Sequence, residues 1–275
     1  MHINLAYDIP AWEEKEIIRE LSNRNINYSI INVNENPFKI KSMENNDLVI
    51  VRCISSSKSL YFSKIAETYG FYTVNSYNTI NITSNKAITS MLLVKNNIKT
   101  PETFIAFSIE KAMDAADNLG YPVVIKPVTG SWGRMISICR NRNELRDFLE
   151  YYENVSNIFY IQRYVKRPKR DIRIIAAGEN IIAATYRYQK DSWKTNTHLG
   201  GRVERAILSD DQKETIIKVA GLFKDSIIGI DAMEDNNEIT VHEINNRVEF
   251  RGAAQIYGNI IVKSIVDFIY KLARC

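Results

Sequence analysis

Two short apolar segments joined by a polar turn, residues 227–233 and 239–244, constrain the fold of this chain most strongly. Their length and alternation predict the two strands of a hairpin. Residues two apart share one face of a strand, so Glu243 and Asn245 lie on the same side, and the first strand presents Asp231. Two carboxylates and one amide are therefore expected to converge. An ordinary hairpin with solvated acidic side chains is the alternative for this pattern taken alone.

Oxygen ligands of this kind suit magnesium. Mg²⁺ is usually held by one or two carboxylates, while waters and the phosphates of a substrate complete its octahedron. We therefore predict that Asp231, Glu243 and Asn245 hold magnesium beside a bound nucleotide.

Length and composition exclude several other classes of protein. The 275 residues suffice for two or three compact subdomains, and 45% hydrophobic with 25% charged residues is typical of a globular protein. The net charge of +4 is well below that of a nucleic-acid-binding surface. The three cysteines lie far apart without metal spacing, so we expect free thiols in the cytoplasm. We expect neither a secretion signal nor a membrane span.

Residues 1–82 read as a small α/β domain. The run 47–52 is almost continuously apolar, as in a parallel strand that is buried on both faces. The predicted strands cover 2–7, 28–33 and 47–52, and the predicted helices cover 12–24 and 59–69.

Residues 83–165 read as a second unit that contains a candidate phosphate-binding loop. A strand ending at Lys126 leads into Gly-Ser-Trp-Gly-Arg at 130–134, whose backbone N–H groups and fixed charges suit a polyphosphate. A surface turn with a solvated lysine is the alternative. Thr83 or Ser84 is the expected N-cap of the first helix. The predicted helices cover 85–95, 109–119 and 144–153, and the other predicted strands cover 103–106, 135–139 and 159–165.

Residues 166–275 read as a third unit, built on an antiparallel sheet. Two alternating strands, 171–176 and 181–188, flank a Gly-Glu-Asn turn and carry Arg173 and Arg187. The other predicted elements are a helix over 210–224, the hairpin described above and a final helix over 258–272.

The order of these motifs resembles that of the ATP-grasp enzymes. The resemblance covers the whole chain and lies in the branch shared by ribosomal-protein glutamate ligases and by ligases that attach an amino acid to an amino-group carrier protein of the LysW type. The motifs that carry it are Tyr-Pro-Val-Val-Ile-Lys-Pro at 121–127, Gly-Ser-Trp-Gly-Arg at 130–134, Arg-Asp-Ile-Arg at 170–173, Asn-Thr at 196–197 and Glu-Ile-Asn at 243–245. It implies an ATP-grasp fold of the α/β class. An N-terminal pre-ATP-grasp domain (1–82) would precede two subdomains, 83–165 and 166–275, that clasp the nucleotide.

The resemblance also implies which residues bind each substrate. The implied ATP-binding residues are Lys86, Lys126, Gly130, Ser131, Trp132, Gly133, Arg134, Gln162, Arg163, Tyr164 and Val165. Relatives usually read Gln-Glu-Tyr where this chain has Gln162-Arg163-Tyr164, so we expect adenine recognition from the backbone of 163–165 rather than a ribose contact from Arg163. The implied magnesium ligands are Asp231, Glu243 and Asn245, for two ions.

The implied reaction is carboxylate activation followed by amide formation. The C-terminal glutamate of a small acidic carrier protein would be phosphorylated by ATP, and the amine of a dicarboxylic amino acid would displace phosphate. Arg173 and Asn196 are the candidates for stabilising the transferred group. The implied amino-acid-binding residues are Arg187, Asn196, Thr197, Glu249, Phe250, Arg251, Gly252 and Ala253. The basic turn 166–170 is a candidate docking surface for the carrier, with a solvated turn as the alternative.

Two features bear on the choice of amino acid. Enzymes of this branch that act on α-aminoadipate carry an Asn-Ser/Thr pair in the segment after the metal asparagine, whereas those that act on glutamate carry Gly-Phe there. This chain reads Glu-Phe-Arg-Gly-Ala at 249–253, so Gly252 favours glutamate and arginine biosynthesis, although Ala253 departs from the pattern.

Several alternatives stay open from the sequence. They are the same reaction with α-aminoadipate in lysine biosynthesis, or with both amino acids, and a ligase that adds glutamate to a ribosomal protein or a cofactor. A nucleotide-binding regulatory module without turnover is disfavoured by the full set of metal and transfer groups, and a nucleic-acid binder by the lack of a basic face. A homo-oligomer without nucleic-acid or membrane partners is expected.

Overall fold

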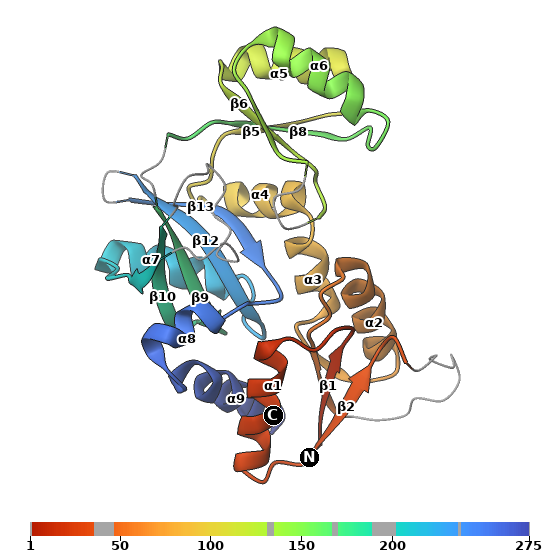
Figure 1. Ribbon diagram of the computed structural model, residues 1–275, viewed down its shortest axis with the longest axis vertical. Coiled ribbons are helices and arrows are strands. Elements are labelled where there is room, and N and C mark those ends of the chain that lie inside the picture. Colours follow the sequence, from red (N-terminus) through yellow and green to blue (C-terminus); the bar gives the residue numbers. More distant parts are fainter. Residues whose placement is uncertain are drawn as a thin grey trace.

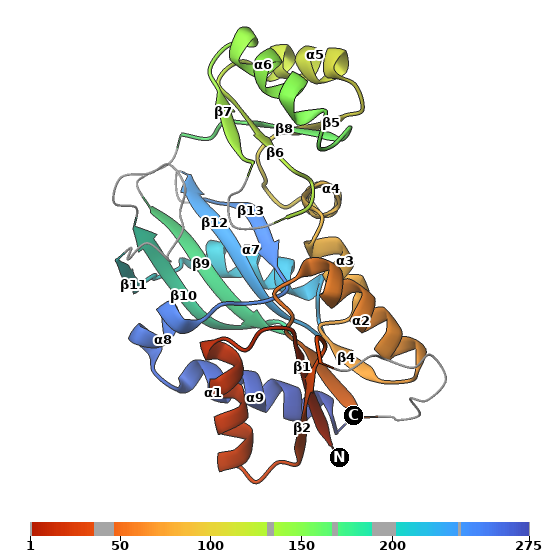
Figure 2. The ribbon, with the colours of Figure 1, turned by 45° about the vertical axis from the view of Figure 1, so that its right-hand side comes forward.

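The computed structural model describes residues 2–35, 47–130, 135–166, 170–188, 202–235 and 238–274. Three sheets follow one another along the long axis of the molecule (Figure 1). A four-stranded sheet from the N-terminal residues lies at one end, a second four-stranded sheet lies at the other, and a five-stranded sheet lies between them (Figures 1 and 2). This mixture of helices and sheets confirms the predicted α/β class.

The N-terminal sheet is wholly parallel, in the order β2-β1-β3-β4. Residues of β3 are buried along its whole length, which confirms the prediction of a parallel strand covered on both faces. One face packs against α2, and the other packs against α1 and the C-terminal helix α9. The elements are β1 (Ile3–Tyr7), α1 (Trp12–Asn23), β2 (Tyr28–Asn32), β3 (Leu48–Val51), α2 (Ser56–Thr68), β4 (Tyr72–Val74) and α3 (Tyr77–Thr83).

Asp8 fixes the loops that follow β1 and β3. Its buried carboxylate accepts hydrogen bonds from the backbone N–H groups of Ile54 (2.7 Å), Ile9 (2.9 Å) and Ser55 (3.1 Å). Burial alone would raise the pKa of Asp8, but the three N–H donors outweigh it and hold the pKa below its ordinary value. The ionised carboxylate therefore holds the two loops together.

We expect Asp8→Asn to destabilise the protein in a pH-dependent way. Because the folded-state pKa lies below the ordinary value of 3.8, the stabilisation by Asp8 is present above that pH and is lost as the pH falls through the folded-state value. The free energy of unfolding should drop by about 1–3 kcal/mol at neutral pH. Urea unfolding across a pH series checks this, with the exposed Asp225→Asn as control. A difference from wild type that is the same at every pH would contradict the assignment.

The sheet at the far end has the order β5-β8-β6-β7 and is antiparallel. Helices α5 and α6 cover its outer face (Figure 1) and share with it a core that includes Leu119, Leu149 and Phe159. The elements are β5 (Thr103–Ala106), α5 (Ile109–Leu119), β6 (Val123–Lys126), β7 (Ser137–Cys139), α6 (Arg142–Tyr152) and β8 (Phe159–Arg163).

Helix α4 (Lys86–Lys95) connects this part to the preceding residues, and its predicted N-cap was wrong. Asn85 caps it, because the Asn85 side-chain oxygen accepts from the N–H groups of Ala87 (3.0 Å) and Ile88 (3.2 Å). Thr83 and Ser84, the two expected caps, belong to the end of the preceding helix. Thr83 is the last residue of α3, and Ser84 is its C-cap.

The five-stranded sheet has the order β11-β10-β9-β12-β13. Along β9 the odd and even residues face opposite ways. Ile172 and Ile174 pack with the α7 side, whereas Ile175 packs with the α9 side. The elements are β9 (Arg170–Ala177), β10 (Asn180–Tyr188), β11 (Val203–Arg205), α7 (Asp210–Gly221), β12 (Ile227–Asp235), β13 (Glu238–Asn245), α8 (Arg251–Tyr257) and α9 (Ile260–Leu272). The predicted hairpin is thereby confirmed.

Two smaller predictions can be compared with the described residues. Cys53 and Cys139 are buried free thiols, as expected. Across the ranges given above, no helix combines the length and the apolar composition that crossing a membrane requires. The domain borders at 82 and 165 stay predictions.

Candidate active site

Asp231, Glu243 and Asn245 lie on one face of the five-stranded sheet. Asp231 on β12 is the register partner of Glu243 on β13, and directly opposed side chains share a face. Asn245 follows two residues later, and its side-chain nitrogen lies 3.5 Å from Oδ2 of Asp231. A register shift between Asp231 and Ala232 places this meeting point beside a bulge.

Two arginines from the neighbouring strands β9 and β10 hold Asp231. Arg173 donates to both carboxylate oxygens, at 2.8 Å for the Nη2–Oδ2 bond. Nη2 of Arg187 lies 3.1 Å from Oδ1 of the same carboxylate. Burial alone would raise the pKa of Asp231, but Arg173 and Arg187 outweigh it, so the pKa lies below its ordinary value. Asp231 is therefore ionised at neutral pH.

Asp171 completes this group, and sequence reasoning did not assign it to the site. Its two oxygens accept from Nε (2.7 Å) and Nη2 (2.9 Å) of Arg187. Burial lowers the pKa of Arg187, but Asp231 and Asp171 outweigh burial and raise it above the ordinary value. A signal was available, because Asp171 lies two residues before Arg173 on one face of β9.

The predicted magnesium ligands fit the ion by the chemistry of their donors. Two carboxylates and an amide oxygen are hard donors of the kind that Mg²⁺ prefers. No group of three or more His, Cys, Asp or Glu residues suited to a metal occurs in the part of the chain that the structure describes, so the predicted set relies on the amide of Asn245 as its third donor. Both oxygens of Asp231 already accept from guanidinium groups. A cation at Asp231 would therefore compete with Arg173.

Lys86, at the first position of α4, lies between this hairpin and the start of the predicted phosphate loop. Its Nζ is 3.6 Å from Oε1 of Glu243 and donates to the carbonyl oxygen of Gly130 (2.7 Å). Its backbone N–H donates to the carbonyl of Val128 (2.7 Å). These contacts place the ammonium group of Lys86 beside the face that carries Asp231 and Glu243.

Lys126 is held at the end of β6 by Gln162 of β8. Nζ of Lys126 donates to Oε1 of Gln162 (2.7 Å). The Gln162 amide nitrogen donates to the hydroxyl groups of Tyr160 (2.8 Å) and Thr103 (3.0 Å). Gln162 is 2% exposed, so its side chain orients Lys126 from within the core.

The side chain of Arg163 on β8 binds residues that flank β5 and end α5. Its guanidinium donates to Glu102 (2.6 and 3.0 Å) and to the carbonyl of Leu119 (2.6 Å). The backbone N–H of Arg163 donates to the carbonyl of Glu102 (2.8 Å), and that of Tyr164 donates to the carbonyl of Pro122 (3.4 Å). The side chain therefore has partners other than a ribose, and recognition of adenine by this stretch stays a prediction.

The segment 249–253 divides between core and surface. Phe250 is 1% exposed and packs edge-on against Trp12, with ring centroids 5.7 Å apart, and Ala253 is also buried. A Cβ at Gly252 would lie 3.7 Å from Val203, an ordinary contact. Glu249 and Arg251 are the more accessible side chains of the segment. Of the side chains predicted to bind the amino acid in this segment, these two are therefore the ones open to solvent.

Some predicted site residues lie outside the described ranges. They are Ser131, Trp132, Gly133 and Arg134 of the phosphate loop, Asn196 and Thr197, and residues 167–169 of the basic turn. The other predicted site residues lie within the described ranges.

Comparison with known proteins identifies the family of the chain. The family model for the RimK-like ATP-grasp domain matches residues 83–269, and that for the LysX pre-ATP-grasp domain matches 5–82. The α-aminoadipate–LysW ligase LysX of Sulfurisphaera tokodaii is 33% identical, with 98% of this chain and 100% of the relative covered. The glutamate–LysW ligase ArgX of the same organism is 32% identical, with 98% of each covered.

A solved structure shows the same fold. The D-alanine–D-alanine ligase of Bacillus anthracis complexed with ATP superposes with a TM-score of 0.76 at 18% identity, covering 100% of this chain and 99% of that one. The ATP-grasp fold binds ATP, usually with magnesium. The chain therefore belongs to the RimK-like ATP-grasp family, carries a LysX-type pre-ATP-grasp domain and is an ATP-grasp ligase.

Proposed function

We propose that this ligase joins glutamate to the C-terminal glutamate side chain of a small acidic amino-group carrier protein of the LysW type. The observation that carries the proposal is the convergence of Asp231, Glu243 and Lys86 on one face of the sheet, in a chain whose relatives over nearly full length are named LysW ligases. The reaction consumes ATP and yields ADP and phosphate.

The chain's own residues are suited to a two-step transfer. A carboxylate oxygen of the carrier attacks the γ-phosphorus, the bond to ADP breaks, and an acyl phosphate forms. The amine then attacks the acyl carbon, phosphate leaves, and the amine loses a proton as the amide forms. Lys86 and Lys126 neutralise phosphate charge, and Arg173 is the candidate for the transferred group. Magnesium, for which we propose two ions, supplies further charge neutralisation when it is bound.

The carrier is proposed to dock near the start of β9. The predicted basic turn 166–170 precedes this strand, and acidic partners are steered by such charges. At its described end, Arg170 pairs with Glu234 (2.7 Å) and stacks on the ring of Tyr186 (3.9 Å to the centroid). Arg170 is thus held in place by the sheet.

The proposal also names the amino acid that is joined to the carrier. Gly252 favours glutamate by its likeness to glutamate-specific enzymes. The 33% and 32% identities to relatives named for α-aminoadipate and glutamate do not separate the two, so α-aminoadipate is the second candidate.

The test offers both amino acids to the enzyme. ATP, magnesium and a LysW-type carrier that ends in glutamate are incubated with glutamate or α-aminoadipate, and the carrier is weighed by mass spectrometry. We expect a mass gain of one glutamate residue with ADP release. A gain with α-aminoadipate alone would assign the second candidate. No gain with either, in the presence of ATP turnover, would refute the carrier as substrate.

A further inference from the structure

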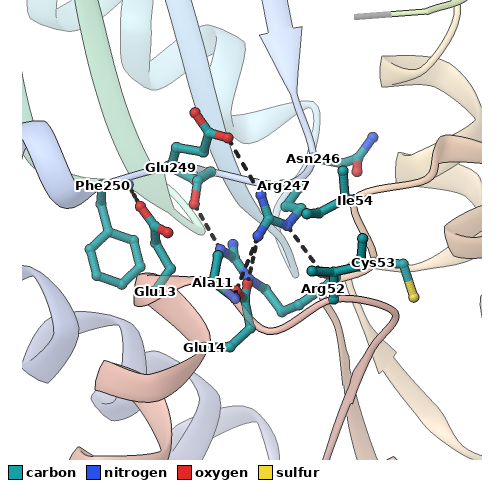
Figure 3. Close-up of polar contacts among 12 residues, drawn as sticks. Ala11, Glu13, Glu14, Arg52, Cys53, Ile54, Asn246, Arg247, Glu249 and Phe250 are labelled. Carbon is teal, nitrogen blue, oxygen red and sulfur yellow. Dashed lines mark hydrogen bonds and ion pairs between the residues drawn. The ribbon is translucent and has the colours of Figure 1, made fainter. Parts of the chain in front are cut away.

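The first turn of α1 reaches the segment that follows the metal-binding hairpin (Figure 3). Glu13 and Glu14 lie on this turn, more than two hundred residues from their partners in 247–251. Neither glutamate has a role in the reaction described above. Both are buried, at 5% and 0% exposed.

Glu14 binds two arginines at once. Its carboxylate accepts from Nε of Arg52 (2.9 Å), from Nη2 of Arg247 (3.1 Å) and from the N–H of Ala11 (2.8 Å). Removing a buried carboxylate from such a group leaves uncompensated charge, so the contacts are strongly coupled.

The same arginines also bind backbone across the interface. Nη2 of Arg52 donates to the carbonyl of Val248 (2.9 Å), and Nε of Arg247 donates to the carbonyl of Arg52 (3.0 Å). Nη1 of Arg247 lies 3.5 Å from Oε1 of Glu249. Arg247 therefore connects the N-terminal sheet to the side chain of Glu249.

Glu13 binds the backbone of Phe250 and Arg251, the two residues that follow Glu249. Its Oε1 accepts the backbone N–H groups of both Phe250 and Arg251, each at 3.1 Å. These N–H groups belong to the beginning of α8, where no helical carbonyl precedes them. One carboxylate oxygen thus fixes the two peptide groups on either side of Phe250, up to the nitrogen of Arg251.

The segment is also held before Arg247. The side chain of Asn246 donates to the hydroxyls of Thr83 (2.9 Å) and Ser84 (3.2 Å), and its carbonyl accepts from Asn75 (2.8 Å). Residues 246–251 are therefore placed by contacts with residues 13–84, directly after Asn245.

We propose that Glu13 and Glu14 are positioning residues for amino-acid selection. They hold 247–251 so that Glu249 and Arg251 face the incoming amino acid at a fixed distance from the metal-binding hairpin. This inference depends on the proposed function. It assigns to the pre-ATP-grasp domain a part in substrate choice, through contacts that touch neither ATP nor the amino acid.

The test compares three variants of α1. Glu13→Ala removes the acceptor for both N–H groups, whereas Glu13→Gln keeps an amide oxygen there. Glu16→Ala is the matched control, because Glu16 is a buried glutamate of the same helix that pairs with Arg19 within it (3.0 Å). We expect Glu13→Ala to raise KM for the amino acid about tenfold or more while KM for ATP stays within about twofold. Glu13→Gln and Glu16→Ala should stay near wild type.

Arg247→Lys is a fourth variant, and it keeps the positive charge opposite Glu14. A lysine cannot reach Glu14, Glu249 and the Arg52 carbonyl together, so the same selective rise in KM is expected. Equal rises in both KM values, or a Glu13→Gln variant as impaired as Glu13→Ala, would overturn the inference.

A measurement without substrates separates this inference from the proposed function. Hydrogen exchange of the Phe250 and Arg251 amides should be faster in Glu13→Ala than in wild type and in Glu16→Ala. Unchanged exchange would refute the positioning contact even if ligation is found. Wild-type protein that ligates neither amino acid would instead refute the proposed function.

Discussion

Glu243→Gln is expected to lower the rate of ATP-dependent ligation by about a thousandfold, which corresponds to about 4 kcal/mol of transition-state stabilisation. The substitution removes one negative charge from the face where Asp231 and Asn245 converge, and with it the carboxylate that we propose as a magnesium ligand. The fold should be nearly unaffected, because the Glu243 side chain is 36% exposed and its ion pair with Lys86 is long, at 3.6 Å. Phosphate release at saturating ATP, measured over a magnesium series, checks the rate and the shift in metal dependence.

Glu238→Gln is the matched control for this variant. Glu238 is at the other end of the same strand β13, is exposed, and pairs with Lys99 (2.7 Å). It should ligate at the wild-type rate. Full activity in Glu243→Gln would refute the metal assignment, and a lowered melting temperature in that variant alone would show a structural role.

Arg187→Ala is expected to lower the free energy of unfolding by about 3–5 kcal/mol. Asp171 is 4% exposed and loses both of its guanidinium bonds, so a carboxylate is left buried without its partner. Asp231 keeps Arg173 but loses its second arginine. Ligation should fall as well, because the carboxylate that we assign to the metal is no longer held in place. Urea unfolding and ligation assays on the same preparation measure both effects.

Two further substitutions separate this structural role from binding of the amino acid. Arg187→Lys keeps the charge but cannot bind Asp171 through two parallel bonds, so an intermediate loss of stability is expected. Arg202→Ala removes an exposed arginine that pairs with Glu204, and should cost less than about 1 kcal/mol. Wild-type stability in Arg187→Ala, together with a raised KM for the amino acid, would favour direct substrate binding over the role described here.

Elements with a strong periodic pattern were predictable from the sequence. The hairpin, the buried parallel strand 48–51 and α5 agree with prediction, because the hairpin alternates, strand 48–51 is a continuous apolar run and α5 has helical spacing. Short elements were missed. Helix α3 is rich in Asn and Thr, which are poor helix formers, and it forms because Ser76 caps it and α2 packs against it. Strand β4 has only three residues, and it forms because it pairs with β3.

In the candidate site, residue types could be predicted but partners could not. Carboxylates on adjacent strands indicated a cation site from spacing alone. The contacts of Arg163 with Glu102 and of Arg187 with Asp171 depend on which strands become neighbours, and local patterns do not specify that. Phe250 shows the same limit of prediction from sequence. It was expected to bind the amino acid, but it is buried against Trp12 of α1, a contact between residues far apart in the sequence.

The contact between α1 and α9 has a consequence for how the chain reaches its fold during synthesis. The strands of the N-terminal sheet come from the first 74 residues, but Ile17, Leu21 and Ile50 share their core with α9, near the C-terminus. Until α9 emerges, only α1 covers this apolar face, and Glu14 lacks its partner Arg247. Contacts of such long sequence separation slow folding. The part of the protein that is made first is therefore expected to be completed last.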